Sequence, residues 1–303
     1  MKTDRLLLAS KSLTGVSIGD AFGESFFGEE SLMKSYIHQR ILPETALDFT
    51  DDTIMAVAIF KSLEKFGKID QDFLAEEFTR NYYLDINRGY GPSMHQYFRT
   101  VKSGEYWKDV SQAKFEGQGS MGNGGAMRAS VIGAYFYDNI EQLKKNAELS
   151  CEVTHANKEA IEGTKAVALA AAFTVQEKLG LAKFGQQEFI RNIQNELDDS
   201  DMKSKLNKVL YLDGNPGIEM LVQTLGNGVK MTAQDTVPLV IWMLSRYRNN
   251  FKECLWNTVA ALGDRDTTCA IAGGVSILCC EENMGPDWID EVENWKKSRF
   301  YEH

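Results

Sequence analysis

Proline, cysteine and histidine are all scarce in this sequence. The 303 residues include 5 prolines, 5 cysteines and 4 histidines. Because proline ends or kinks helices, a content well below the usual fraction of about 5% favours a helical chain. The cysteines are too few and too irregularly spaced for a disulfide framework, which indicates reduced, intracellular thiols. Scattered histidines and the lack of a Cys-x-x-Cys pair make zinc a poor candidate.

Long apolar runs and an excess of positive charge are also missing. No window approaches the roughly 18 apolar residues of a membrane helix, and the short run from Leu6 to Ala9 is too brief for the core of a signal peptide. Lys and Arg total 33 against 43 Asp and Glu, a net charge of −10. This balance argues against broad binding to nucleic acid or to an anionic membrane. We therefore expect a cytoplasmic protein without a membrane partner, and nucleic acid is a poor candidate partner.

Hydrophobic periodicity predicts helices along most of the chain. Over residues 53–66, Met55, Ile59 and Leu63 recur at helical spacing, and Gly67 follows where a helix would stop. No series of alternating strands with hairpin turns is present. The sequence therefore predicts an all-α fold. Further buried helices are expected over residues 158–178, 236–247, 255–262 and 267–280.

No repeat, low-complexity tract or linker divides the chain. The most polar stretch, residues 181–235, is expected to be a solvated helical excursion. Turns rich in Thr and Asp stand near both ends of the chain, at residues 50–53 and 264–268. If both turns serve one site, the chain must close on itself. We therefore expect residues 1–303 to form a single domain.

Each of these two turns directly precedes a predicted apolar helix. The first reads Phe49-Thr-Asp-Asp-Thr53 and the second Gly263-Asp-Arg-Asp-Thr-Thr268. One interpretation is helix capping, because Thr and Asp oxygens accept hydrogen bonds from free N–H groups and acidic residues complement the helix dipole. A cap needs only one acceptor, however, whereas each turn has two carboxylates with hydroxyls beside them. The apolar helices also predict that these turns lie inside the protein.

A metal site is the other interpretation of the two turns. Four carboxylates brought together would repel one another unless cations neutralise them. Carboxylate and hydroxyl ligands suit Mg²⁺ or Mn²⁺, and sometimes Ca²⁺. In two-metal sites the ions lie roughly 3.5–4 Å apart and share bridging carboxylates. The two turns together supply enough oxygens for such a pair.

A glycine-rich segment and a single histidine complete the motifs. Five glycines fall within residues 117–125, a content that a helix does not tolerate cheaply. Such a segment is either an ordinary tight loop or a binding loop whose N–H groups approach phosphate or sugar oxygens, with Ser120 and Asn123 adding groups suited to hydroxyls. His155 stands just before an apolar helix. It is either a capping or core residue or a residue that contacts a ligand. The chain has no G-x-S-x-G turn.

In chain order, these motifs resemble the ADP-ribosylglycohydrolases, or ADP-ribosyl-acceptor hydrolases. The dinitrogenase reductase-activating glycohydrolases and some lens crystallins belong to the same family. The resemblance runs from residue 15 to about residue 275. It rests on seven segments: Gly15-Val-Ser-Ile-Gly-Asp-Ala-Phe-Gly23, Phe49-Thr-Asp-Asp-Thr53, Arg88-Gly-Tyr-Gly91, Gly119-Ser-Met-Gly-Asn-Gly-Gly-Ala-Met-Arg128, Val153-Thr-His-Ala156, Asp235-Thr-Val-Pro238 and Gly263-Asp-Arg-Asp-Thr267.

The resemblance implies a fold, an activity and a cofactor. The implied fold is a compact single-domain orthogonal multi-helix bundle, with a di-metal site at helix N-termini. The implied activity is reversal of ADP-ribosylation, by hydrolysis of the bond between ADP-ribose C1″ and its acceptor. Two Mg²⁺ or Mn²⁺ ions are the implied cofactors. The implied partner is an ADP-ribosylated acceptor, in the first place a protein, and ADP-ribose is the product.

The resemblance also implies roles for individual residues. The implied metal ligands are Thr50, Asp51, Asp52, Asp264, Asp266 and Thr267. The ligand-binding residues are Gly119, Ser120, Met121, Gly122 and Asn123, which would hold the distal ribose and diphosphate, with His155 contacting the same ligand and Phe115 forming a wall. The proton of the attacking water would pass to Glu24, Asp51 or Asp52.

The chain departs from the family pattern at two positions. Arg265 stands where the family often has a small residue or Thr. Phe27 stands where many members have a Glu, four residues after the glycine matched by Gly23, and Glu24 and Glu29 are the nearby substitutes.

Two other functions stay open: an inactive ADP-ribose-binding or structural protein, as the crystallin members suggest, and a two-metal phosphohydrolase that cleaves the diphosphate.

Overall fold

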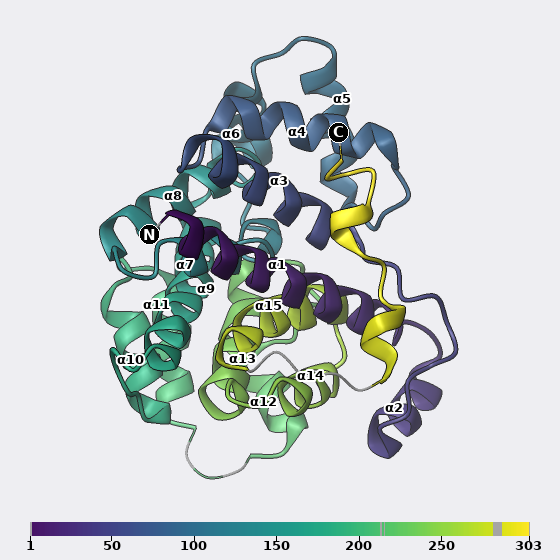
Figure 1. Ribbon diagram of the computed structural model, residues 1–303, viewed down its shortest axis with the longest axis vertical. Helices are drawn as coiled ribbons and strands as arrows, with labels where there is room; N and C mark the ends of the chain where they lie inside the picture. The colour runs from purple at the N-terminus through teal and green to yellow at the C-terminus, as the bar shows by residue number, and fades with distance from the viewer. Residues whose placement is uncertain (1, 213, 215, 281–286, 303) are drawn as a thin grey trace.

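The computed structural model describes residues 2–212, 214, 216–280 and 287–302 (Figure 1). All regular elements of these residues are α- or 3-10 helices, and the one bridge outside them pairs Gly122 with Thr232. The predicted all-α class is confirmed. No α-helix in the described ranges is both long and apolar enough to cross a bilayer.

Helix α1 (Lys2–Glu24) crosses the middle of the molecule, with α15 (Arg265–Ser276) packed along it (Figure 1). The two helices approach so closely that only glycine fits at the contact. A Cβ atom at Gly19 would lie 2.0 Å from the carbonyl oxygen of Cys269, and one at Gly23 would lie 2.1 Å from that of Arg265. The glycines of the first motif therefore bring the end of α1 against the beginning of α15.

Helix α3 (Asp51–Phe66) packs on the other side of α1. Its predicted stop at Gly67 is confirmed, because Gly67 adopts a φ of 69° and its N–H donates to the Leu63 carbonyl. The helix starts two residues earlier than predicted, with Thr50 as its N-cap. The first Thr/Asp turn is therefore the first turn of α3 itself.

The other predicted helices are present with shifted ends. Helix α9 (Lys158–Lys178) matches its predicted range, and α13 (Ala233–Tyr247) starts three residues before it. The predicted range 255–262 was wrong at both ends: α14 is Phe251–Val259, because the Asn250 side chain accepts a hydrogen bond from the Glu253 N–H and starts the helix earlier. At the predicted end of the last helix, α15 gives way to the 3-10 helix Ile277–Cys279.

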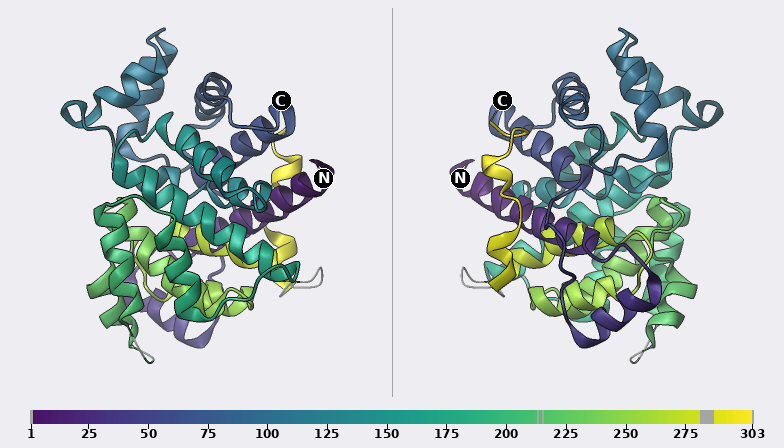
Figure 2. Two further views of the ribbon diagram at one scale, coloured as in Figure 1. Left: turned by 90° about the vertical axis from the view of Figure 1, so that its left-hand side faces the viewer. Right: turned by 90° about the vertical axis from the view of Figure 1, so that its right-hand side faces the viewer.

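The polar stretch is helical, as expected, and each of its helices also buries an apolar face. It contains α10 (Gln186–Asn195), α11 (Asp201–Leu210) and α12 (Ile218–Leu225), which contact α9 or α13. Figure 2 shows these green helices toward one end of the molecule and the blue helices of residues 71–117 at the other. The remaining elements are α2 (Glu30–Gln39), α4 (Gln71–Leu84), α5 (Pro92–Lys102), α6 (Trp107–Gly117), η1 (Asn123–Gly125), α7 (Ser130–Tyr135), α8 (Ile140–Glu152), η3 (Asp287–Glu291) and η4 (Trp295–Lys297).

Buried apolar side chains from both ends of the chain form one contiguous core. The C-terminal segment joins it, because Trp295 lies 5.6 Å from the Phe60 ring and donates its indole N–H to Thr14. The five cysteines are free thiols, as predicted. Burial raises the pKa of Cys151 to about 11 and that of Cys254 to about 12, which disfavours the reactive thiolate form.

Candidate active site

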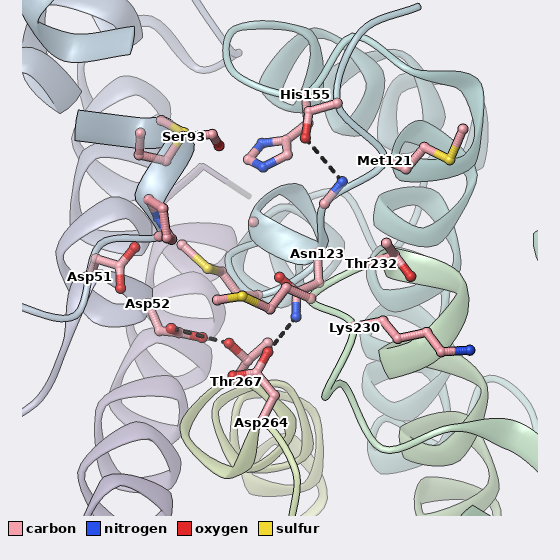
Figure 3. Close-up of a pocket in the computed structure, with 18 of the residues that line it drawn as sticks. Asp51, Asp52, Ser93, Met121, Asn123, His155, Lys230, Thr232, Asp264 and Thr267 are labelled. Atoms are coloured by element: carbon pink, nitrogen blue, oxygen red, sulfur yellow. Dashed lines mark hydrogen bonds between the residues drawn. The ribbon is translucent and has the colours of Figure 1, made fainter. Parts of the chain in front are cut away.

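The two Thr/Asp turns and the glycine segment line one cavity of about 430 Å³ (Figure 3). The beginnings of α3 and α15 form its floor, and the loop between α6 and α7 forms a wall. Of the residues assigned to the site from sequence, only Thr50 and Glu24 are outside the lining. The others line it: Asp51, Asp52, Phe115, Gly119, Ser120, Met121, Gly122, Asn123, His155, Asp264, Asp266 and Thr267.

The carboxylates at the floor are close enough to repel one another. Asp51 and Asp52 are 8% and 2% exposed, so the first turn lies inside the protein as predicted, whereas Asp264 and Asp266 of the second turn are partly exposed. Burial, followed by the charges of Asp266 and Asp20, raises the pKa of Asp51 well above its usual range. Burial and the same two charges do so for Asp52, and burial with Asp266 does so for Asp264. This is the electrostatic condition that a bound cation relieves.

Helix capping explains Thr50 but not Asp264. Thr50 is the N-cap of α3, and its hydroxyl accepts the Asp52 N–H at 3.4 Å. Asp264 occupies the N-cap position of α15, but its side chain makes no capping hydrogen bond to a backbone N–H of that helix. Instead its Oδ2 accepts from the Asn123 side-chain amide at 2.6 Å. The second turn therefore uses its carboxylate toward the cavity.

Asp20 is a fifth carboxylate that the sequence analysis did not assign. It is fully buried in α1 and accepts hydrogen bonds from the N–H and hydroxyl of Thr50, at 2.9 and 2.8 Å. It also accepts from the N–H and hydroxyl of Thr53, at 3.0 and 2.6 Å. Burial and the charge of Asp266 raise the pKa of Asp20 to about 7. Asp20 thus holds the first turn in place through Thr50 and Thr53. Its position in the glycine motif Gly19-Asp20-Ala21 is the sequence feature that could have pointed to it.

The donor set at the floor fits hard cations. The Oδ1 atoms of Asp52 and Asp266 are buried and have no hydrogen-bond partner, which is costly unless another group satisfies them. The Thr267 hydroxyl lies 3.4 Å from Asp52 Oδ2, so the two turns also meet directly. Within the described ranges, no three His, Cys, Asp or Glu side chains stand in an arrangement ready to hold an ion. Metal binding by these residues stays a prediction.

The glycine segment presents His155 and Asn123 to the cavity. A Cβ atom on Gly122 would lie 2.7 Å from His155 Nε2, and one on Gly124 would lie 2.5 Å from His155 Cε1. The absence of side chains there leaves room for the imidazole, which lies across the cavity from Asp264 and Thr267 (Figure 3). His155 is 6% exposed and so is both a core residue and a lining residue.

Glu24 and Glu29 occupy different surroundings. Glu29 is the N-cap of α2, where its carboxylate accepts from the Ser31 and Leu32 N–H groups. Glu24 ends α1; it is exposed, yet partial burial of its carboxyl group and the charge of Asp266 raise its pKa to about 7. Of the two substitutes considered for the glutamate that Phe27 replaces, Glu24 is the one whose pKa is affected by a carboxylate of the cavity floor.

The two departures from the family pattern contact each other. The Arg265 guanidinium lies 4.8 Å from the Phe27 ring centroid and donates to the Phe26 carbonyl. Arg265 is buried at the start of α15, whereas Phe27 is 45% exposed. The pair therefore links the end of α1 to α15 outside the cavity.

Several lining residues were not assigned to the site from the sequence. Ser93 and Met94 come from the beginning of α5, and Lys230, Met231 and Thr232 come from the loop before α13. The second loop is held against the glycine segment, since the Asn123 N–H donates to the Met231 carbonyl at 3.1 Å. These contacts depend on tertiary packing alone.

The raised pKa values predict an unusual pH dependence of stability for the metal-free protein. Unfolded carboxyl groups lose their protons near pH 4. In the folded protein, Asp20, Asp51, Asp52 and Asp264 hold theirs to higher pH. The folded state then binds more protons, so the free energy of unfolding falls as the pH rises from 5 toward 8. Urea denaturation in EDTA should show this fall, and saturating Mn²⁺ should remove most of it. An identical slope with and without Mn²⁺ would contradict the prediction.

The all-helical fold agrees with the class of hydrolases that the motifs resemble. The family model for ADP-ribosylglycohydrolase matches residues 1–302. The chain belongs to the ADP-ribosylglycohydrolase family, and this membership supports a hydrolase that acts on ADP-ribosylated substrates.

Vertebrate relatives and a solved structure agree with this assignment. The chain is 31% identical to ADP-ribosylhydrolase ARH3 of Bos taurus, over 84% of this chain and 76% of the relative. It is 28% identical to ADP-ribosylhydrolase ARH3 of Homo sapiens, over 94% of this chain and 89% of the relative. A solved structure titled "ADP-ribosylglycohydrolase-related protein complex" matches with a TM-score of 0.62 and 19% identity, covering 96% of this chain and 94% of that one. The structural likeness shows the fold.

Proposed function

We propose that this protein is a Mg²⁺- or Mn²⁺-dependent hydrolase that cleaves the N- or O-glycosidic bond at ribose C1″ of an ADP-ribosylated acceptor. The observation that carries the proposal is the shared cavity, in which the two acidic turns face the glycine loop. The names of the ARH3 relatives support the same activity. A protein acceptor is the first candidate, because the net charge of −10 disfavours nucleic acid.

The role proposed for each residue follows from its position in the cavity. Two cations would be held by Thr50, Asp51, Asp52, Asp264, Asp266 and Thr267; once bound, they would neutralise these carboxylates and acidify a water molecule. The glycine segment, residues 119–123, would hold the diphosphate and distal ribose, with Phe115 closing the open side. Glycoside cleavage passes through an oxocarbenium-like state at the anomeric carbon, so the ribose must be held still while a carboxylate removes a proton from water. Glu24, Asp51 and Asp52 are the carboxylates available for that step.

A turnover assay tests the activity. The purified protein is incubated with arginine-linked and serine-linked ADP-ribosylated peptides, in Mn²⁺ or in EDTA, and the released product is identified. We expect free ADP-ribose in Mn²⁺ and none in EDTA. Release that ignores EDTA, or no release from any linkage, would contradict the proposal. AMP as the product would indicate a phosphohydrolase, and tight ADP-ribose binding without turnover would indicate a binding protein.

Replacing Gly122 with alanine should weaken ligand binding without straining the backbone. Gly122 has a φ of −59°, which alanine adopts readily, but its new methyl group would collide with His155 Nε2. Overpacking of this kind costs roughly 1–3 kcal/mol, so the Kd for ADP-ribose should rise about tenfold or more. Gly91→Ala is the matched control, because Gly91 also lines the cavity and has nothing within 4 Å of its Cβ position. Calorimetry should find Gly91→Ala near wild type, and equal Kd values for the two variants would refute the steric explanation.

A further inference from the structure

Arg128 is a fully buried cation. Among the described residues, none of its hydrogen bonds goes to a carboxylate. Its Nη2 donates to the Ser150 carbonyl at 2.7 Å and to the Thr154 hydroxyl at 2.9 Å, and its Nε donates to the Ser150 hydroxyl at 3.4 Å. The guanidinium also lies 4.6 Å from the Phe78 ring centroid. Burial lowers its pKa to about 10, so it remains charged at neutral pH. Burying such a charge is expensive, which calls for a role beyond packing.

The hydrogen bonds of Thr154 have only one consistent direction. Its oxygen accepts from Arg128, and its remaining neighbour is His155 Nδ1 at 2.7 Å. The hydroxyl has one proton, and among the described residues it has no other hydrogen-bond acceptor for it. Thr154 therefore donates to His155 Nδ1, which must be unprotonated. A neutral imidazole with a bare Nδ1 carries its proton on Nε2.

The surroundings of the imidazole favour its neutral form. Burial, and then the charges of Lys114 and Arg128, hold the pKa of His155 well below its usual range. Nε2 faces the Gly122–Gly124 segment at the cavity and has no hydrogen-bond partner among the described residues. Its N–H is thus a free donor on the cavity wall (Figure 3).

We propose that Arg128 and Thr154 are positioning residues that hold His155 as the Nε2–H tautomer, so that it offers one fixed donor to an oxygen of the bound ligand. A phosphoryl or ribose oxygen accepts such a bond. A group that could both donate and accept a hydrogen bond would not select an acceptor oxygen of the ligand in this way. The part of this inference that concerns the ligand rests on the proposed function, while the tautomer is a property of the free protein.

The tautomer can be measured directly, because the chain has only four histidines. Two-bond ¹H–¹⁵N correlation spectra of the free protein distinguish Nε2–H, Nδ1–H and doubly protonated rings, and a His155→Asn variant assigns the signal. We expect Nε2–H in the wild type and in Thr154→Ser, which keeps the hydroxyl. Thr154→Val keeps the shape but cannot donate, so Nδ1–H should become populated. A wild-type ring protonated on Nδ1, or an unchanged tautomer in Thr154→Val, would overturn the proposal.

Calorimetry with ADP-ribose tests the consequence for binding. The Kd should rise about tenfold in Thr154→Val, the value of one hydrogen bond, and stay near wild type in Thr154→Ser. Thr174→Val is the matched control, because Thr174 is equally buried and its hydroxyl donates to the Ala170 carbonyl instead. If Thr154→Val and Thr174→Val bind equally well, the positioning role is wrong. If no variant and no wild-type sample binds ADP-ribose, the proposed function fails, and the spectra still decide the tautomer.

Discussion

An Asp266→Asn variant should lose both its metal response and nearly all its activity. Asp266 lines the cavity, and its charge is a cause of the raised pKa values of Asp51, Asp52 and Asp264. Asparagine keeps the size of the side chain while removing that charge. Without metal, the variant should be as stable as the wild type or more stable, because the carboxylate repulsion is reduced. The wild type should gain stability with Mg²⁺ or Mn²⁺ in proportion to its affinity, and the variant should not.

Thermal unfolding with and without Mn²⁺, together with the ADP-ribose release assay, measures both effects. Activity should fall by several orders of magnitude, because the attacking water and the ribose lose the cation that activates them. If Asp266 merely stabilised the start of α15, the loss of stability would be no more than about 1 kcal/mol and activity would persist. Asp72→Asn is a suitable control, because Asp72 lies in the first turn of α4 with its carboxylate on the Trp107 indole N–H, outside the cavity lining. A variant at 266 that still responds to Mn²⁺ and turns over normally would place the metal site elsewhere.

The sequence revealed the helices because their signals are local. Helix α9 was predicted with its observed bounds, since a long alanine-rich segment has no competing turn signal. Helix α14 was misplaced because its start depends on the Asn250 side chain, whose capping bond to Glu253 is invisible to hydrophobic periodicity. Such capping contacts decide the ends of helices more than their existence.

The site divides in the same way into local and tertiary parts. Thr50, Asp51 and Asp52 lie in one turn and could be predicted together, as could the loop around Asn123. Asp20 could not be singled out by a turn signal, because it lies within a continuous helix and reaches Thr50 and Thr53 only through the packing of α1 on α3. Lys230 and Thr232 were missed for the same reason, since their loop reaches the cavity through contacts with the glycine segment.

The choice between Glu24 and Glu29 shows what the fold adds to the sequence. Both lie near the position where many family members have a glutamate. Only the structure shows that the Glu29 carboxylate accepts hydrogen bonds from N–H groups at the start of α2, whereas the charge of Asp266 helps to raise the pKa of Glu24. A carboxyl group whose pKa is raised to about 7 is suited to take a proton near neutral pH. Of these two glutamates, Glu24 is therefore the better candidate for the general base, although it lies outside the cavity lining formed in part by Asp51 and Asp52.

Replacing Glu24 with glutamine should separate catalysis from metal and ligand binding. General-base catalysis contributes roughly 10²–10⁴-fold, so kcat should fall by about that factor. The Mn²⁺-dependent gain in melting temperature should remain, in contrast to Asp266→Asn, and the Kd for ADP-ribose should stay close to wild type. The basic form of Glu24 accumulates as the pH rises through its pKa, so wild-type kcat/KM should rise with pH on the acid side of its profile. The variant should lack that rise. Glu29→Gln, which leaves the cluster untouched, should behave like wild type in turnover; full activity in Glu24→Gln would transfer the role of base to Asp51 or Asp52.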